Sequence, residues 1–348
     1  MFNKLTFFKF KKKPLFLKKN IMKKINPTNY FILLLIIFSS LFLASCENNT
    51  IESQIEELIS LKNREKIKKI AYSLADSLDT KASNLLLQKY SNQNISKEKA
   101  IWSLQDMIVR YSEINDSRIV ECISNITNPN PINSFRNEER LNLIIYGLKL
   151  KNTSKKFKNI LYNSALKHNK KGMLSLIESW KEDKDSKVFL DAIKVFEDKA
   201  IYYLGQLITT EKYTIDLLAR IGEAAIPLMK QKMNSNSQSV RFAAGDVLVK
   251  MIEYHPNALS DLTTSINKQG IKKIADNYIF YIRLGQSGSE NIILKALRYN
   301  FSYTMCLDLL NCGSSIIESG ATEIARKNGY EVTSSIGSHS GPRWGGKK

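Results

Sequence analysis

Histidine, cysteine, proline and glycine are all scarce in this sequence, and each shortage excludes a class of protein. The 348 residues include 3 histidines and 4 cysteines, too few for a histidine-rich metal centre or a scaffold built from disulfides. With 15 glycines and 7 prolines, the chain lacks the turn residues that an all-β protein needs. Because 43% of the residues are hydrophobic and 24% are charged, the composition indicates a globular chain with a sizeable core.

Acidic residues are also in the minority, and the formal net charge is +19. Residues 1–45 carry nine lysines and no acid, which leaves +10 for the rest of the chain. The chain is rich in Lys, Asn and Ile, a pattern that biased genome composition produces without selection for a ligand. We therefore interpret the remaining charge as a weak indication of anionic partners.

Long hydrophobic runs are limited to one, from Tyr30 to Leu43. Its 14 residues are fewer than the roughly 20 that a helix needs to span a bilayer. A lysine-rich segment precedes the run and small residues follow it, which is the pattern of a secretory signal peptide. Met22 is the more usual start for such a peptide, so we interpret residues 1–21 as a candidate extension from an upstream start codon.

The run ends in Leu43-Ala44-Ser45-Cys46, which resembles the lipobox of bacterial lipoproteins. The resemblance implies cleavage before Cys46 and lipid on its sulfur, so that residues 1–45 are removed and residues 46–50 form a short lipidated tether. Several acyl chains give stable anchoring, because each buried CH₂ contributes about 0.8 kcal/mol. The implied location is the bacterial cell envelope, outside the cytoplasm, with the membrane and its face left open. The alternative is a cysteine at the end of an uncleaved signal anchor.

From residue 51 to about 330, apolar residues recur at spacings of three and four, as at Ile101, Leu104 and Ile108. Alternating patterns of strands are absent, so the spacing predicts an all-α chain. We expect roughly 15–17 short helices. Three glycines are predicted to end helices: Gly222, Gly285 and Gly329.

A helix pair is most explicit in Leu217–Met233 followed by Gln238–Met251, with Pro227 in the first helix and Ala243-Ala244 in the second. This unit resembles a HEAT repeat. The resemblance implies a right-handed α-solenoid of stacked helix pairs, HEAT- or armadillo-like. It is supported by an echo, because the Ala-Arg-Ile-Gly at 219–222 recurs as Ile-Arg-Leu-Gly at 282–285, close to two units of some 31 residues later.

These patterns divide the mature chain into three parts. Residues 51–199 are predicted to form degenerate helical repeats, and residues 200–330 HEAT-like repeats with a C-terminal cap. Residues 331–348 are predicted to be a disordered tail because of their composition, with Trp344 as a docking element being the alternative. Within the clearest repeat, we expect Ala243 and Ala244 to face a neighbouring helix.

The same register places two polar side chains of that repeat, Lys232 and Gln238, on the solvent side.

Residue patterns that carry catalysis are missing. The segment Gly337-Ser-His-Ser-Gly has His339 where a nucleophile elbow needs serine, and no glycine-rich phosphate loop occurs. His168 and His255 are far apart and have no acidic partner at helical spacing, so we expect surface histidines. We therefore predict no enzyme, no metal and no cofactor. The remaining cysteines are expected to be buried thiols: Cys122, Cys306 and Cys312.

One window of charge is less ordinary, since nine Lys or Arg and no acid occur from Arg140 to Ile177. Its lysines alternate with apolar residues, which predicts lysines on the exposed side of an amphipathic helix. Two interpretations stay open, a solvated helix face or a patch for an anionic surface such as phospholipid head groups, envelope polysaccharide or an acidic protein. The candidate patch is Lys155, Lys156, Lys158, Lys167, Lys170 and Lys171.

The leading functional hypothesis is a non-catalytic scaffold, attached to a membrane by lipid and binding protein partners on the surface of its solenoid. One alternative is an envelope hydrolase whose active site is not visible in sequence. Another is a binder of an anionic envelope polymer through the 140–177 window. Nucleic acid is not an expected partner, because export separates the chain from it.

Overall fold

The computed structural model describes residues 50–129, 136–332 and 344–346. In these ranges the chain forms nineteen α-helices and three short 3-10 turns and no β-strand, so the prediction of an all-α fold is confirmed. The helices outnumber the 15–17 expected because some apolar segments are divided. Asn277, for example, interrupts the segment between α16 (Ile271–Asp276) and α17 (Tyr278–Leu284).

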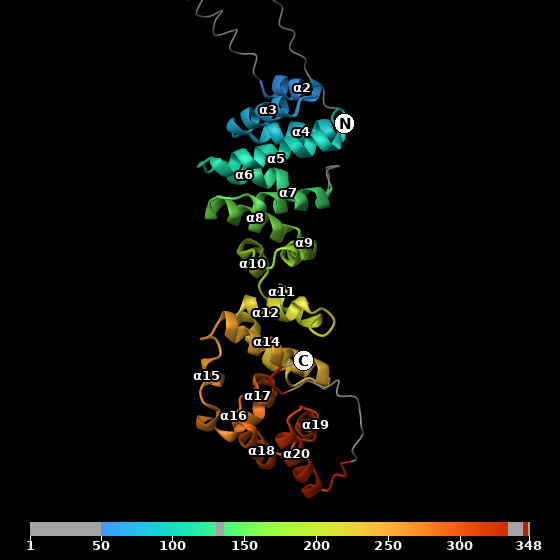
Figure 1. Cartoon of the computed structure of the whole chain (residues 1–348). Coiled ribbons are helices and arrows are strands. Elements are labelled where there is room, and N and C mark those ends of the chain that lie inside the picture. Colours follow the sequence, from blue (N-terminus) through green and yellow to red (C-terminus); the bar gives the residue numbers. More distant parts are fainter. Residues whose placement is uncertain (1–49, 130–135, 333–343, 347–348) are drawn as a thin grey trace, which may run out of the picture.

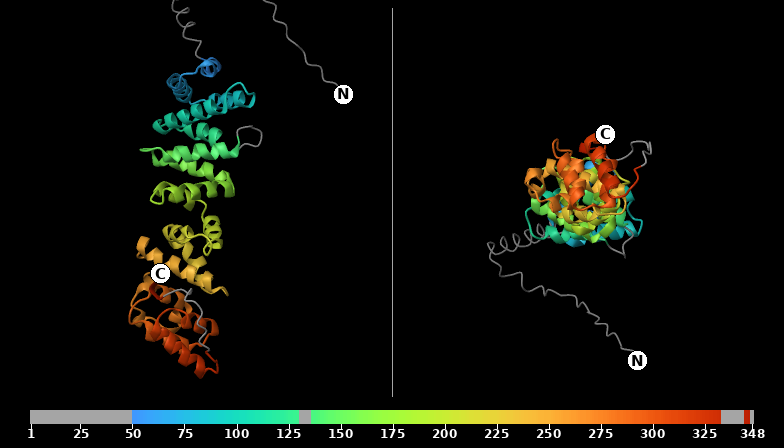
Figure 2. Two further views of the ribbon diagram at one scale, coloured as in Figure 1. Left: turned by 45° about the vertical axis from the view of Figure 1, so that its right-hand side comes forward. Right: turned by 90° about the horizontal axis from the view of Figure 1, so that it is seen from below.

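The helices are stacked in chain order along one long axis (Figures 1 and 2). Helices two apart in the chain pack on each other, from α2 on α4 and α3 on α5 to α7 on α9. Each helix therefore buries its apolar stripe between its neighbours, and the core runs the length of the stack. The prediction of an α-solenoid of stacked helix pairs is confirmed.

The first part of the stack contains eight helices, most of which begin at a side-chain cap. At Ser96, for example, Oγ accepts a hydrogen bond from the backbone N–H of Lys99 at 3.3 Å. Lys99 in turn donates from Nζ to the carbonyls of Ile59 and Leu61, both at 2.7 Å, so a cation from one helix satisfies the end of another. The eight are α2 (Ile51–Ser60), α3 (Arg64–Asp76), α4 (Thr80–Ser91), α5 (Lys97–Glu113), α6 (Ile119–Thr127), α7 (Asn137–Lys149), α8 (Lys155–Lys167) and α9 (Asn169–Glu182).

The second part has shorter helices and contains the helix pair in which the sequence suggested a HEAT-like unit. Besides α16 and α17, its helices are α10 (Lys187–Lys194), α11 (Asp198–Gln206), α12 (Tyr213–Ile221), α13 (Ile226–Lys232), α14 (Gln238–Tyr254), α15 (Ser260–Thr263), α18 (Glu290–Tyr299), α19 (Tyr303–Leu310) and α20 (Ser315–Lys327). The 3-10 turns are Glu223–Ala225, Ile266–Lys268 and Trp344–Gly346. No helix in the described ranges is long and apolar enough to cross a membrane.

Glycine ends helices where the sequence predicts it. Gly222 follows α12 with φ +92°, Gly285 follows α17 with φ +61°, and Gly329 lies just beyond α20. A positive φ costs glycine little because it has no Cβ. Gly222 also divides the first helix of the HEAT-like unit into α12 and α13, and Pro227 lies in the first turn of α13, where its missing N–H costs nothing.

Helix α14 is the centre of that unit and packs against both α12 and α17. Ala243 and Ala244 are both buried, as predicted. The prediction for Gln238 is wrong, because it is half-buried and donates from Nε2 to Oδ1 of Asp308 at 3.0 Å. Lys232 is half-buried as well, since its aliphatic stem covers Gly205 of α11. Both side chains touch elements that the local pattern does not reveal.

The structure shows where the histidine and cysteine side chains lie and what they contact. The expectation of a surface residue is wrong for His168, which is 7% exposed and donates from Nε2 to the carbonyl of Thr127 at 2.7 Å. Arg140, fully buried, donates to the neighbouring carbonyls of Asn125 and Ile126, so two basic groups cap the C-terminal end of α6. His255 is half-buried, and His339 lies outside the described residues. The three cysteines predicted to be buried thiols are buried and free: Cys122, Cys306 and Cys312.

The chain termini fall largely outside the described residues, as do Leu43, Ala44, Ser45 and Cys46. Of the predicted tail 331–348, the structure describes residues 331–332 and 344–346. Trp344 is half-buried against the core, and its backbone N–H donates to the carbonyl of Cys312 at 2.5 Å. A Cβ on Gly285 would lie 2.1 Å from Cα of Gly345, so these two glycines allow the turn to approach the end of α17.

Candidate binding groove between α9 and α11

The succession of packed helices changes between α9 and α11. Helix α10 packs on α9, whereas α11 packs on α12 and α13, and α9 and α11 are not among the closely packed pairs of the described helices. The turn from α10 to α11 contains Glu197 with φ 49° and ψ −132°, a conformation that residues other than glycine seldom adopt. This turn directs α11 away from α9 and leaves an opening between them.

The opening is a groove of about 340 Å³. One wall is formed by the end of α8 and the start of α9, where the helix is broken at His168 and Asn169 (φ 54°). The other wall carries residues of α11 at the spacing i, i+3, i+4, i+7, and a stripe with that spacing normally packs on the next helix of the stack. Here the stripe of α11 faces the groove, which we call the α9–α11 groove. Its residues are Leu166, Asn169, Lys170 and Met173 on one wall, Lys199, Tyr202, Tyr203 and Gln206 on the other, and Phe196 between them.

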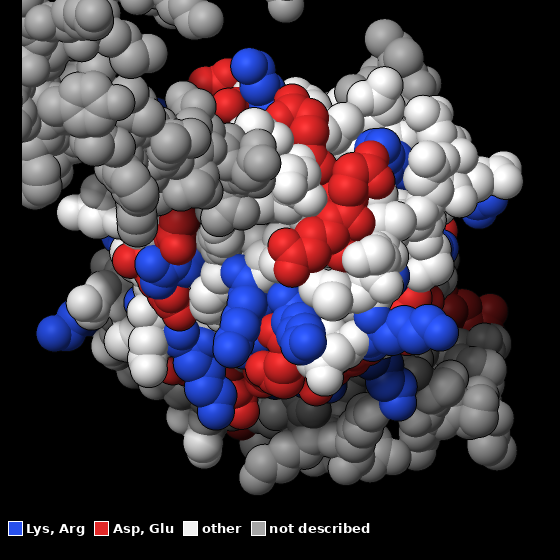
Figure 3. Space-filling view, turned by 90° about the horizontal axis from the view of Figure 1, so that it is seen from above, with Lys and Arg blue, Asp and Glu red and all other residues white. Residues whose placement is uncertain are grey.

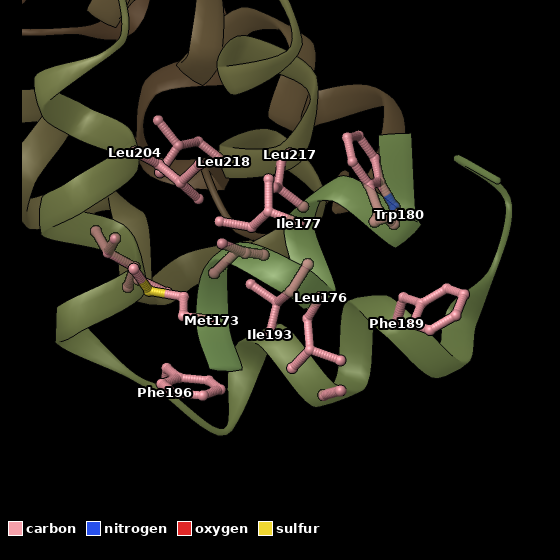
Figure 4. Packing of buried hydrophobic residues seen from close by; sticks show 14 of the residues in the cluster. Met173, Leu176, Ile177, Trp180, Phe189, Ile193, Phe196, Leu204, Leu217 and Leu218 are labelled. Atoms are coloured by element: carbon pink, nitrogen blue, oxygen red, sulfur yellow. The ribbon is translucent and has the colours of Figure 1, made fainter. Parts of the chain in front are cut away.

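The floor of the groove is apolar and belongs to the core. Met173 and Phe196 are both buried, and Figure 4 shows them together at the edge of a cluster that includes Leu176, Ile177 and Leu204. The methionine thioether is polarizable and adapts to irregular neighbours. The floor is therefore fixed by packing on one side and accepts apolar groups on the other.

The rim of the groove is aromatic and basic. Tyr202 is 63% exposed, and Nζ of Lys170 lies 5.3 Å from the ring centroid of Tyr203, a cation–π contact. The lining includes two lysines and no carboxylate. The acids next to Lys199 in sequence, Glu197 and Asp198, line a separate hollow. The groove therefore favours a partner with negative charge and apolar side chains.

The structure distributes the six lysines of the candidate anionic patch over two places. Lys155, Lys156 and Lys158 lie in the first turn of α8, and Lys167, Lys170 and Lys171 lie at the junction of α8 and α9. At 1.5 Å per residue, Lys156 and Lys167 are about 16 Å apart along the helix. Lys158 is half-buried and the other five are exposed. Lys170 is the member of the set that lines the groove.

Sequence reasoning missed the wall formed by α11. The available signal was the spacing of Lys199, Tyr202, Tyr203 and Gln206 with an aromatic pair at its centre. That spacing is the same for a stripe that packs in the core and for one that faces solvent. Whether another helix covers the stripe is decided by the turn at Glu197, which has no signature of its own.

In the part of the chain that the structure describes, no group of three or more His, Cys, Asp or Glu side chains is arranged to hold a metal ion. The histidines at 168 and 255 contact backbone carbonyls instead.

Comparison with known proteins gives no assignment for this groove. No protein-family model matches the chain, and no curated protein is similar to it in sequence. The functional argument therefore rests on the geometry and charge of the chain itself.

Proposed function

We propose that this chain is a lipid-anchored, non-catalytic scaffold of the bacterial cell envelope that binds a protein partner in the α9–α11 groove. The observation that carries the proposal is the stripe of α11 that faces the start of α9 across an open groove lined by two lysines and no carboxylate. A helix or extended segment of a partner would supply the packing that α9 and α11 do not supply to each other.

The size and rim of the groove favour side chains of a protein. A cavity of about 150 Å³ holds a benzene ring, so 340 Å³ has room for about two ring-sized groups. Tyrosine is enriched at protein interfaces because its ring buries a large area and its hydroxyl remains hydrated. Tyr202 and Tyr203 place such rings at the rim, and Lys170 and Lys199 add charge.

The scaffold is proposed to be HEAT-like, on the basis of the helix pair formed by α12–α13 and α14. The two arginines of the sequence echo each lie over an aromatic ring of α14, Arg220 at 4.5 Å from the ring centroid of Tyr254 and Arg283 at 6.0 Å from that of Phe242. Their ion pairs differ, because Arg220 pairs with Asp216 of its own helix and Arg283 pairs with Asp246 of α14. Both helices pack on α14. Equivalent positions on successive units are what a repeat produces.

The anchor is proposed from Leu43-Ala44-Ser45-Cys46 alone. Cells grown with labelled palmitate should incorporate label into the wild-type chain and into a Cys122→Ala control. A Cys46→Ala variant should incorporate none. Equal labelling of the Cys46→Ala variant would show that the lipoprotein assignment is wrong.

Photo-crosslinking in cells tests the groove. The crosslinking amino acid p-benzoylphenylalanine replaces Tyr202 in the full chain, and in a control it replaces Val120, an exposed apolar residue of α6. We expect a discrete crosslinked species from position 202 only. Reversing charge in the groove, by Lys170→Glu with Lys199→Glu, should remove that species. The same reversal at Lys268 and Lys272, which are distant from the groove, should not, and equal products from positions 202 and 120 would contradict the proposal.

A second candidate is binding of an anionic polymer by the lysines of α8 and α9, since five of the six are exposed. Dextran sulfate serves as the probe. If the polymer is the ligand, replacing Lys155 and Lys156 by Glu weakens retention on dextran sulfate and leaves crosslinking at position 202 unchanged. If the groove is the site, the same variant binds its partner as the wild type does.

A further inference from the structure

Exposed hydrophobic side chains are concentrated at the C-terminal end of the stack. Seven large hydrophobic residues are exposed in the described ranges, and five of them lie within 32 residues near the end of the main body, between 299 and 330. Their exposed fractions run from 39% to 68%. The five are Tyr299, Tyr303, Leu307, Ile316 and Tyr330.

Three of these side chains surround a hollow between α19 and α20. Tyr303 and Leu307 are one helical turn apart on α19, and Tyr330 follows α20. The ring of Tyr330 lies 5.4 Å from the rings of both Phe301 and Tyr303, measured between centroids. The hollow has a volume of about 490 Å³, and Leu310 and Val332 complete its apolar lining. Glu318, Thr322 and Glu331 also line it, so the hollow is an aromatic surface with an acidic edge.

The opposite end of the stack has a different character. Seen along the axis in Figure 3, it presents acidic and basic side chains beside one another. No large hydrophobic residue is exposed between residues 50 and 119. A terminal repeat needs a polar outer face to remain soluble, and the N-terminal end meets that need. The C-terminal end combines a polar outer side of α20 with the five exposed hydrophobic side chains, so an apolar surface remains beside its polar one.

The outer side of helix α20 carries charges of both signs. Helices α18 and α19 pack on two of its sides. Its outer side forms a shallow surface in which Ser319 and Thr322 lie beside Glu323, Arg326 and Lys327. Within one chain, Glu323 forms an ion pair with Lys327 of the same helix, which leaves Arg326 as the cation beside it. In an antiparallel pair of α20 helices, with the axis near residues 324 and 325, Glu323 of each copy would also lie opposite Arg326 of the other. Such a surface fits itself across a two-fold axis.

We propose that the C-terminal face, formed by Tyr303, Leu307, Ile316, Tyr330 and the outer side of α20, is the interface of a two-fold dimer of this chain. At about 200 Å² for a large side chain, the four exposed hydrophobic residues of this face contribute about 390 Å². A standard interface needs about 800 Å² per partner, and the polar surface of α20 supplies the rest. Head-to-tail association is disfavoured, because the charged N-terminal end offers no apolar surface to the aromatic hollow.

Sedimentation velocity of the full-length chain in detergent tests the proposal, and the charge pair provides variants that leave the lipid unchanged. We expect a dimer for the wild type. Glu323→Arg brings cations together and Arg326→Glu brings anions together, so each should raise the dissociation constant at least tenfold. The double variant Glu323→Arg/Arg326→Glu restores the pairing and should restore the dimer.

Two further variants separate this interface from other causes of association. Tyr303→Asp should give monomers, while Tyr202→Asp, equally exposed but on α11, should remain dimeric, and circular dichroism verifies that each is folded. A wild-type monomer, or a dimer that none of the three single changes on the C-terminal face weakens, would overturn the proposal. So would a monomer that dimerises when residues after Val332 are removed, because the chain's own C-terminal segment would then be the occupant of this face.

Discussion

The carboxylate of Asp308 is the most consequential single group in the C-terminal part of the stack. It is fully buried on α19 and accepts hydrogen bonds from Arg241 Nε at 2.8 Å and Nη2 at 2.6 Å. The hydroxyl of Tyr278 donates to it at 2.6 Å, and Gln238 Nε2 donates at 3.0 Å. One side chain therefore joins α14, α17 and α19, and it is the anion that offsets the buried guanidinium of Arg241.

Removing this carboxylate should destabilise the fold by about 3–5 kcal/mol. Burial lowers the pKa of Arg241, but the hydrogen bonds and charge of Asp308 outweigh that effect and raise it overall. In an Asp308→Ala variant the guanidinium, 5% exposed, loses its partner while still charged. A buried charge without its partner costs about 3–5 kcal/mol. Asp308→Asn keeps the shape and should cost less, because the amide oxygen still accepts a hydrogen bond.

Replacing both charges distinguishes the loss of an ion pair from the loss of packing. Buried ion pairs exchanged for apolar residues of similar volume often retain stability. An Arg241→Met/Asp308→Leu variant should therefore recover at least half of the free energy lost by Asp308→Ala. The remaining deficit comes from polar groups that lose a partner, chiefly the hydroxyl of Tyr278 and also the carbonyls of Ser235 and Asn236 that Arg241 contacts. An unsatisfied buried donor costs about 1–3 kcal/mol.

Urea unfolding of a fragment lacking residues 1–45, combined with hydrogen exchange, measures these differences. In a solenoid each unit contacts only its neighbours, so protection should fall first in α14, α17 and α19 and remain in α2 to α9. Asp261→Ala is the matched control, because Asp261 is exposed and such residues change stability by about 0.5 kcal/mol or less. If Asp308→Ala costs under about 1 kcal/mol, or the double variant loses as much as the single one, the reasoning is refuted.

Three further changes test other parts of the fold. Ala244→Leu overfills the buried face of α14 and should cost about 1–3 kcal/mol in urea melts; a wild-type midpoint would show that the register is wrong. Burial lowers the pKa of His168 below 6.5, so its neutral ring contributes fully above pH 6.5 and the contribution declines as the pH falls below that value. His168→Gln, which can still donate to Thr127, should make the free energy of unfolding depend less on pH between 7 and 5, and an unchanged slope would contradict this. Gly285→Ala forces a Cβ toward Gly345 and should expose Trp344, detected as a red shift of fluorescence; an unshifted spectrum would show that the turn is not held there.

Local features of this protein follow directly from its sequence. The spacing of apolar residues predicts helices because a helix buries one stripe, and that requirement holds whatever the neighbour is. Gly222 and Gly285 end their helices because a positive φ at a helix end is a property of the residue itself. The burial of Ala244 was predictable for a similar reason, since a small side chain within an apolar stripe indicates a close helix contact.

Contacts between distant parts of the chain were not predictable in this way. The pattern of its own helix predicts that Gln238 is exposed to solvent, yet Gln238 donates a hydrogen bond to Asp308, which is 70 residues away. His168 has no acidic neighbour at helical spacing, and the carbonyl of Thr127 that it contacts is 41 residues earlier. The local pattern of residues along one helix does not reveal a contact with a residue that tertiary packing brings from another helix.

The candidate site shows the same division. Lys170 was identified from the sequence because it lies in the window from Arg140 to Ile177, which contains lysine and arginine but no acid. The wall formed by Tyr202 and Tyr203 became visible only with the tertiary structure, because the same spacing fits a core stripe. Sequence alone determined that these helices form and stack. The turn at Glu197 decided where one of them lies relative to the next, and therefore which stripe stays uncovered, because a single backbone angle between two rigid helices moves every residue beyond it.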